Sequence, residues 1–253
     1  MSSLQIIPHR SNKRGNADHG WSKVFHTFSF AMYQTNTHNH YGHWHLRVLN
    51  EDRVQPFTDF VETIGNIEIL KRGLGYTQMI SVGTGIRHSE KNNGEDEAHL
   101  LQIWAILTTA NLSPAYYIRH FLDEDKYDKW VRTVAPVGSK GVRDQREASG
   151  PSPVHSPLTV FVTLLSPDKE IFLTFPRPRF CCSSKGYIHV IQTSGYNAGN
   201  GAGGRISVSA GNRRVETVLR EGDGAYMMAD GGSELVVTNT GDSTVEIILI
   251  DME

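Results

Sequence analysis

The segment Ser81–Glu90 combines a glycine-rich turn with an imidazole and a carboxylate two residues apart, in the order Gly-Thr-Gly-Ile-Arg-His-Ser-Glu. Successive side chains of a β-strand point to opposite faces, so His88 and Glu90 would lie on one face and could bind one cation. A neutral imidazole with a carboxylate suits iron, manganese, nickel or zinc. Two protein ligands are too few for a tightly held ion, so this interpretation requires further donors.

Histidines upstream of this segment are the candidates for those donors. Two His-x-His pairs, His38 with His40 and His43 with His45, would each face one way on a strand. We expect His43 and His45 to be the additional metal ligands if the site is complete. The alternatives remain open: these histidines could lie in a loop and titrate near neutral pH, and His88 with Glu90 could form a buried ion pair that stabilises the turn.

The elements that would position these residues are predicted to be β-strands. Short runs rich in Val, Ile and Thr alternate with Gly, Asn, Asp and Ser turns, a pattern typical of an antiparallel sandwich or barrel. The acidic run Asp123–Lys126 predicts one short helix, or alternatively a solvated turn. The strands are expected at 25–30, 45–49, 67–70, 77–81, 100–107, 159–165, 171–175, 187–193, 205–209, 234–239 and 245–251.

Residues 138–157 divide the chain by composition, because they are rich in Ser, Pro, Gly and charged residues. This composition is typical of an exposed linker or long loop. We therefore expect an N-terminal β domain at 1–137, a linker at 138–157 and a C-terminal β domain at 158–253.

Charge and hydropathy narrow the classes of partner. The net charge is −2 without a Lys/Arg block, which argues against direct nucleic-acid binding. The sequence has no apolar run of membrane-spanning length and no export signal, so we expect an intracellular protein with no membrane partner. The adjacent Cys181 and Cys182 fit a reducing compartment as buried thiols, with a vicinal redox switch as the alternative.

Four segments in this order resemble the pirin-like proteins. They are Phe28–Phe30, Leu46–Val54, Gly83–Glu90 and Leu101–Trp104, and a fifth segment, Glu221–Tyr226, extends the resemblance towards the end of the chain. The resemblance implies an all-β tandem cupin fold of two jelly-roll barrels, the N-terminal one holding Fe(II) or another divalent transition metal. It also implies a quercetinase-type dioxygenase activity on phenolic substrates, or a transcription-coregulating role with a protein partner, in the cytoplasm or the nucleus.

One departure from the family pattern concerns the metal ligands. Pirin-like proteins carry a His-Pro-His motif, which supplies two of four ligands, between the equivalents of Val54 and the glycine turn. Here Val54 is followed by residues 55–66, which contain no histidine. A hairpin of about two ordinary strand lengths is missing, so we expect an incomplete N-terminal barrel in which His88 and Glu90 remain without their usual partners.

Three hypotheses follow from this departure. The first is a pirin-like protein that is non-catalytic or weakly active because half of its metal-ligand set is absent. The second is a metal-dependent dioxygenase acting on quercetin-like or other phenolic substrates, in which His43 and His45, or waters, complete the ligand set. The third is that the coding sequence around residues 55–66 has been misread and the protein has a complete site.

Overall fold

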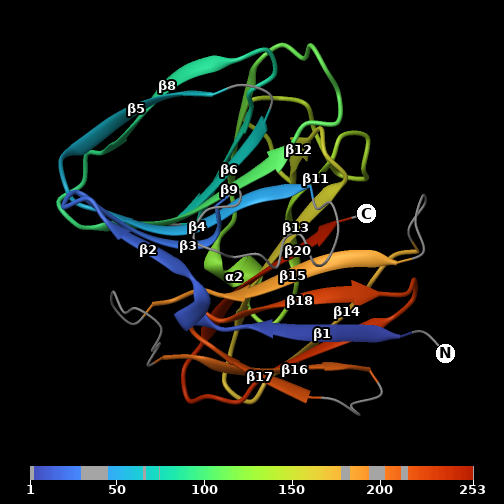
Figure 1. The fold of residues 1–253 in the computed structure, drawn as a ribbon. Coiled ribbons are helices and arrows are strands. Elements are labelled where there is room, and N and C mark those ends of the chain that lie inside the picture. The colour runs from blue at the N-terminus through green and yellow to red at the C-terminus, as the bar shows by residue number, and fades with distance from the viewer. Residues whose placement is uncertain are drawn as a thin grey trace. The chain divides into compact units, whose positions relative to one another are not determined.

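The computed structural model describes residues 3–29, 45–64, 67–73, 75–177, 183–193, 203–211 and 216–252. His38, His40, His43, Cys181 and Cys182 lie outside these ranges. The described chain is mostly β-strand (Figure 1) and forms two compact units. The C-terminal unit comprises Met1–Lys13, Leu122–Thr133 and Leu158–Glu253; the N-terminal unit comprises Arg14–Phe121 and Val134–Pro157.

The C-terminal unit contains two antiparallel sheets with an apolar core. Alternate residues such as Ile188 and Val190 in one sheet and Ile206 and Val208 in the other belong to a single buried cluster, as expected for two sheets packed face to face. Within this unit the first sheet runs β1 (Leu4–His9), β18 (Gly224–Ala229), β15 (Ser184–Val190), β20 (Val245–Met252), β13 (Leu158–Leu165) and β11 (Val131–Pro136), of which the residues up to Thr133 belong to the unit. The second sheet runs β14 (Glu170–Thr174), β19 (Glu234–Asn239), β16 (Arg205–Ala210), β17 (Glu216–Arg220).

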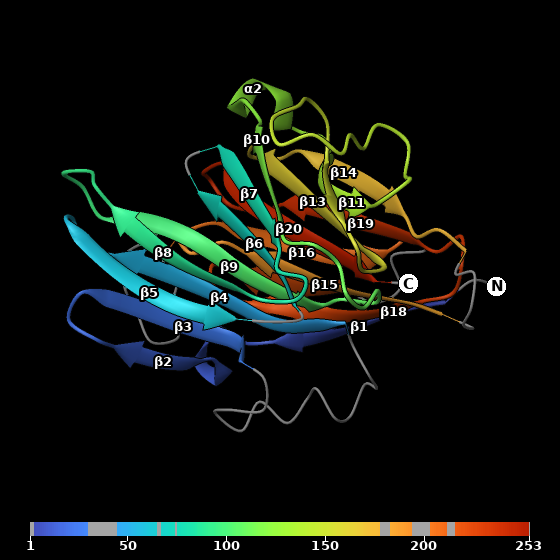
Figure 2. The same cartoon turned by 90° about the horizontal axis from the view of Figure 1, so that it is seen from above.

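The N-terminal unit contains a seven-stranded sheet and, in the described residues, a second sheet of two strands. Figure 2 shows the two strands of the second sheet, β5 (Thr58–Ile64) and β8 (Ile86–Asn92), side by side. The corresponding second sheet of the C-terminal unit has four strands. The larger sheet runs β10 (Ala115–His120), β7 (Tyr76–Ser81), β6 (Ile67–Gly73), β9 (Ala98–Ile106), β4 (Leu46–Val54), β3 (Ser22–Ser29), β2 (Gly15–Asp18).

Short elements connect these sheets. A 3₁₀ turn, η1, spans Ser11–Lys13, and the predicted short helix is present as α2 at Asp123–Lys126. The predicted exposed linker contains a strand, β12 (Ser152–Val154), whose three residues are buried and which pairs in parallel with the end of β11. Backbone pairing thus orders a segment whose composition indicated a loop. The predicted domain boundaries stay a prediction.

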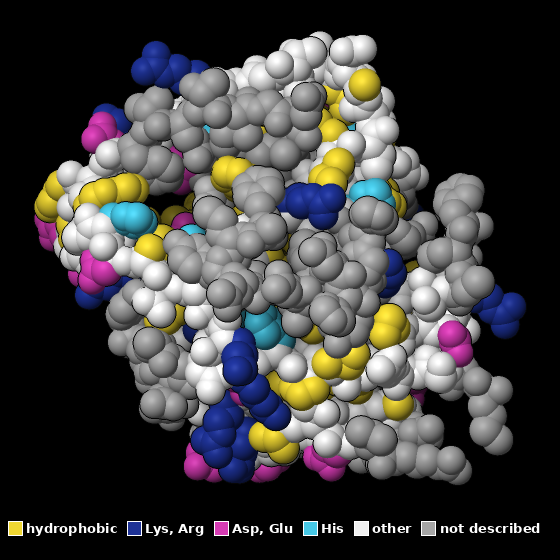
Figure 3. All heavy atoms as spheres, in the orientation of Figure 1, with side chains coloured by type: hydrophobic (Ala, Val, Ile, Leu, Met, Phe, Trp, Pro, Cys, Tyr) yellow, Lys and Arg dark blue, Asp and Glu magenta, His cyan; other side chains and the backbone are white. Residues whose placement is uncertain are grey.

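The exposed surface carries charges of both signs. Figure 3 shows Lys and Arg side chains in several separate groups on the face it draws, with Asp or Glu beside some of them. In the part of the chain that the structure describes, no helix is long and apolar enough to cross a membrane.

Candidate functional site: a pocket beside His88 and Glu90

The turn before β8 requires glycine. Gly83 has φ +54°, and a Cβ atom there would lie 2.1 Å from the carbonyl oxygen of Leu112. The same oxygen accepts a hydrogen bond from the Thr84 amide at 3.1 Å. Gly85 has φ +130°, which also favours glycine, and β8 begins at the next residue. The glycines therefore allow close backbone approach and set the direction in which β8 leaves the turn.

β8 places His88 and Glu90 on the same face, as the two-residue spacing predicts. Burial alternates along the strand, with Arg87 and Ser89 exposed and His88 and Glu90 partly buried. His88 Nε2 lies 3.1 Å from Glu90 Oε1, and the two side chains are 15% and 18% exposed. The structure therefore brings the two predicted ligands together as a hydrogen-bonded pair.

These two donors do not by themselves fit a transition-metal site. Within the described ranges, no group of three or more His, Cys, Asp or Glu side chains is arranged to hold a metal ion. His45 lies just before β4, where its carbonyl oxygen accepts a hydrogen bond from the Ile106 amide at 2.8 Å. His43 lies outside the described residues, so the predicted role of His43 and His45 as ligands stays a prediction.

A pocket of about 510 Å³ opens beside this pair. Its polar lining comes from His88, Glu90, Tyr116 and Arg146 together with neighbouring residues of β7, β8 and β10. The pocket is within the size range of small-molecule sites, roughly 300–1,000 Å³. Its geometry therefore allows a small ligand to contact both the His–Glu pair and a guanidinium group.

Apolar side chains support the pocket from within the N-terminal unit. Val82 is fully buried, and Ile80, Ile86 and Trp104 pack against it. Phe28 is also fully buried. Phe28 and Trp104, which lie in two of the segments that carry the resemblance, thus belong to the apolar packing of the N-terminal unit.

Sequence reasoning missed Tyr116 and Arg146 as lining residues. The Arg146 guanidinium carbon lies 5.4 Å from the centroid of the Tyr116 ring, within cation–π range. Burial raises the pKa of the Tyr116 hydroxyl, and the nearby Arg146 charge opposes part of that rise. The Tyr116 side chain is therefore a neutral hydroxyl at physiological pH. Neither residue carried a sequence signal: Tyr116 lies in β10, which is outside the strands expected from the sequence, and Arg146 lies in the segment predicted to be a linker.

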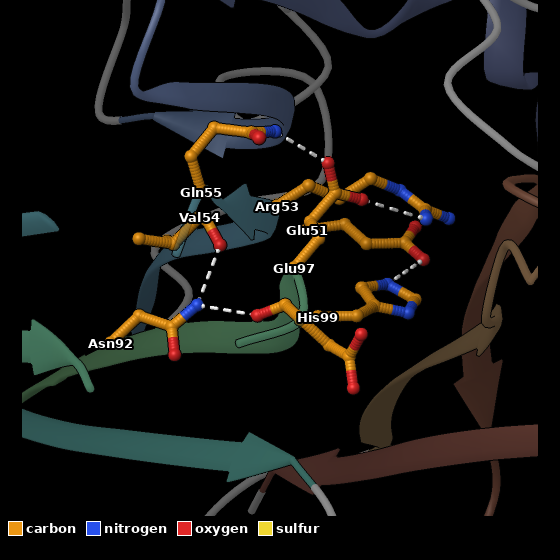
Figure 4. Close-up of polar contacts among 8 residues, drawn as sticks. Glu51, Arg53, Val54, Gln55, Asn92, Glu97 and His99 are labelled. Atoms are coloured by element: carbon orange, nitrogen blue, oxygen red, sulfur yellow. Dashed lines mark hydrogen bonds and ion pairs between the residues drawn. The ribbon is translucent and has the colours of Figure 1, made fainter. Parts of the chain in front are cut away.

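A second polar network lies where β4 pairs with β9 (Figure 4). Glu51 accepts hydrogen bonds from Arg14 Nη1 and from His99 Nε2, both at 2.9 Å. Figure 4 also shows Glu97 accepting from Arg53 and Gln55. The Asn50–Arg53 part of the motif used for the resemblance thus supplies structural contacts.

No family model matches the chain. The Escherichia coli protein named quercetin 2,3-dioxygenase is 36% identical over 138 residues, which cover 46% of this chain and 58% of that protein. A Zymomonas mobilis relative bears the same enzyme name as a provisional assignment and is 28% identical over 259 residues, which cover 93% of this chain and 98% of that protein.

Solved structures agree with the fold. The crystal structure of YhhW from Escherichia coli matches with a TM-score of 0.74 and 24% identity over 98% of both chains. A second structure, described as the bacterial pirin YhhW in complex with nickel(II), matches with a TM-score of 0.69. The predicted all-β tandem cupin fold is thereby confirmed. The relatives and the solved neighbours are thus quercetin 2,3-dioxygenase-like and pirin proteins, to which this chain is similar in sequence over part of its length and whose bicupin fold it shares.

Proposed function

We propose that this chain is a pirin-family protein with little or no oxygenase activity, because its N-terminal unit has lost half of the metal-ligand set. The observation that carries the proposal is the 3.1 Å contact between His88 Nε2 and Glu90 Oε1. This contact joins Nε2 of His88 to one carboxylate oxygen of Glu90, and a metal ion would have to compete with it for these two donor atoms. Affinity falls steeply when ligands and their supporting contacts are missing.

Two further observations support a missing segment. The second sheet of the N-terminal unit has two strands in the described residues, whereas that of the C-terminal unit has four. The alignment with the Escherichia coli relative runs over 138 positions but takes in 46% of the 253 residues here, so part of the relative is unmatched. Both fit the loss of a segment from the N-terminal half, and the sequence pattern places that loss near residues 55–66.

Metal content is the first test. After dialysis against a mild chelator, elemental analysis of the purified protein is expected to find well under one equivalent of iron, nickel, manganese or zinc. A loosely held ion cannot fix the orientation of substrate and dioxygen, and much of the catalytic advantage of a metal enzyme comes from such positioning. Oxygen uptake with quercetin is therefore expected to match that of free metal in buffer.

Two substitutions make the activity test specific. His88→Ala removes a pocket imidazole, whereas His19→Ala removes an exposed imidazole outside the pocket lining. We expect both variants to take up oxygen at the background rate. Stoichiometric metal together with uptake that His88→Ala abolishes and His19→Ala preserves would refute the proposal.

The second candidate function is a metal-dependent dioxygenase acting on quercetin-like phenols. The pocket favours it, because His88 and Glu90 line a cavity of about 510 Å³ that can accept a small molecule. The Escherichia coli relative bears the name of this activity. In this case His43 and His45, or waters, would complete the binding of Fe(II) or another divalent metal, and sequencing the transcript across residues 55–66 would test whether a ligand segment has been overlooked.

The protein partner and the cellular location of this chain are also proposals. A protein partner with a transcription-regulating role follows only from the resemblance. The relatives described above are bacterial, so they give no support to a nuclear location.

A further inference from the structure

We propose that the pocket beside β8 binds a small aromatic monocarboxylate, with the carboxylate held by the guanidinium group of Arg146. The proposal concerns a ligand class and a specificity-determining residue, and it depends on how the protein holds the Arg146 loop. It rests on the proposed function in one respect: without a tightly bound cation at His88 and Glu90, the positive charge in the pocket comes from the two arginines of its lining, Arg87 and Arg146. Of these, Arg146 is the one that lies over the Tyr116 ring and belongs to the loop held by Arg119.

The backbone at Arg146 is fixed by β10. Arg119 is 1% exposed, and its guanidinium group donates from Nη1 to the Arg146 carbonyl oxygen at 3.0 Å and from Nη2 to the Arg143 carbonyl oxygen at 2.7 Å. The Ile118 amide donates to the same Arg146 oxygen at 2.8 Å. A buried guanidinium that bridges two carbonyl oxygens of one loop holds that loop in a single position against the strand.

Two further contacts flank Arg146. The Tyr117 hydroxyl donates to Asp144 Oδ1 at 2.6 Å, and Glu147 forms a parallel bridge with Ile118. Asp144, the nearest carboxylate before Arg146 in the sequence, therefore already accepts a hydrogen bond from Tyr117. The loop is held on both sides of Arg146, so little backbone entropy would be lost when a ligand binds there.

The Arg146 side chain is available for a ligand. It is exposed, and its guanidinium group lies over the Tyr116 ring, with no carboxylate of the described residues within ion-pair distance. A guanidinium group presents two parallel N–H donors that match a carboxylate. The neutral Tyr116 hydroxyl offers a further donor in the same pocket.

The remaining lining selects the rest of the ligand. Ile80, Ile86 and Pro114 supply apolar surface, and the Tyr116 ring supplies an aromatic surface. Glu90 places a carboxylate in the same pocket, which disfavours a second anionic group on the ligand. One aromatic ring with one carboxylate satisfies these conditions.

Isothermal titration calorimetry with sodium benzoate and its neutral analogue benzamide tests the proposal on the chelator-treated full chain. We expect benzoate to bind at least about tenfold more tightly than benzamide, because only benzoate brings a negative charge to the hydrogen bonds with the guanidinium group; tenfold corresponds to about 1.4 kcal/mol. Arg146→Gln should reduce benzoate affinity at least about tenfold and leave benzamide unaffected. Arg143→Gln, in the same loop but outside the pocket lining, should bind benzoate like the unaltered protein.

Four results would overturn the proposal: equal binding of the two probes, no benzoate binding at millimolar concentration, an Arg146→Gln variant that binds normally, or equal losses in both arginine variants. Benzoate binding that appears only after nickel(II) or iron(II) is added would assign recognition to the metal and also overturn it. The metal content of the chelator-treated protein, measured separately, decides the proposed function, so the two failures are distinguishable. Circular dichroism confirms that each variant is folded.

Discussion

Replacing Glu51 by glutamine tests the most buried charge network in the described part of the N-terminal unit. The side chains of Glu51 and Arg14 are each 1% exposed and lie 2.9 Å apart. The Arg14 guanidinium carbon also lies 4.3 Å from the centroid of the Phe25 ring. Glu51→Gln keeps the shape of the side chain but removes its charge, so Arg14 remains buried without this counter-ion.

The geometry sets the size of the effect. Removing one partner of a buried ion pair costs about 3–5 kcal/mol. Losing the second contact, from His99, should cost less stability, because the His99 side chain is 26% exposed and water can replace part of this hydrogen bond. Glutamine retains one oxygen that can accept a hydrogen bond, so we expect a loss of about 3 kcal/mol. For a folding unit of this size, a loss of about 3 kcal/mol corresponds to a fall in Tm of roughly 6–12 °C.

Thermal and urea unfolding, followed by circular dichroism, measure this loss. Glu97→Gln is the matched control, because Glu97 is 35% exposed and its ion pair with Arg53 is longer, at 3.4 Å. The control should lose less than about 1 kcal/mol. Equal losses in the two variants, or a Glu51→Gln variant as stable as the original protein, would refute the argument from burial.

Two further predictions concern the glycine turn and a partly buried histidine. Gly83→Ala should destabilise the protein by about 2–4 kcal/mol in urea unfolding, because it combines an unfavourable φ with a 2.1 Å contact to Leu112. The control Gly20→Ala, at φ +80° with no atom within 4 Å, should lose only about 1 kcal/mol. Similar losses in the two variants would contradict the contact argument. Burial lowers the pKa of His26 from its ordinary value of 6.5, despite the hydrogen bond with Asn50 that raises it. The unfolded chain therefore takes up the proton first, so stability is full above pH 6.5 and falls as the pH drops towards the folded-state pKa. His26→Gln should flatten the pH dependence of the urea midpoint below pH 6.5, and an unchanged slope would count against this assignment.

Much of the fold could be predicted where local pattern and pairing agree. The strand predicted at 234–239 coincides with β19, and the acidic run at Asp123–Lys126 forms α2. β18 was missed because Gly-Ala-Tyr-Met-Met-Ala has little intrinsic strand preference. It is a strand because β1 and β15 pair with it on both sides. Such long-range pairing is not visible in a local window.

The candidate site divides in the same way. The common face of His88 and Glu90 follows from strand alternation, a local property. The position of Arg146 depends on Arg119, 27 residues earlier. Arg119 donates hydrogen bonds to backbone oxygens, which any residue type in the loop would supply. No residue type or spacing signals a contact of that kind. Sequence reasoning therefore finds the His–Glu pair but not the guanidinium group that lines the same pocket.

The interleaving of the two units has a consequence for synthesis on the ribosome. β1 is made first, yet its pairing partner β18 begins at Gly224. At about 5–20 residues per second, this strand would wait roughly 10–40 s before its partner exists. The N-terminal unit, in contrast, has all of its segments once Pro157 has been made. The order of synthesis therefore favours early folding of the unit that contains the pocket, while an apolar strand from the other unit stays available for incorrect pairing.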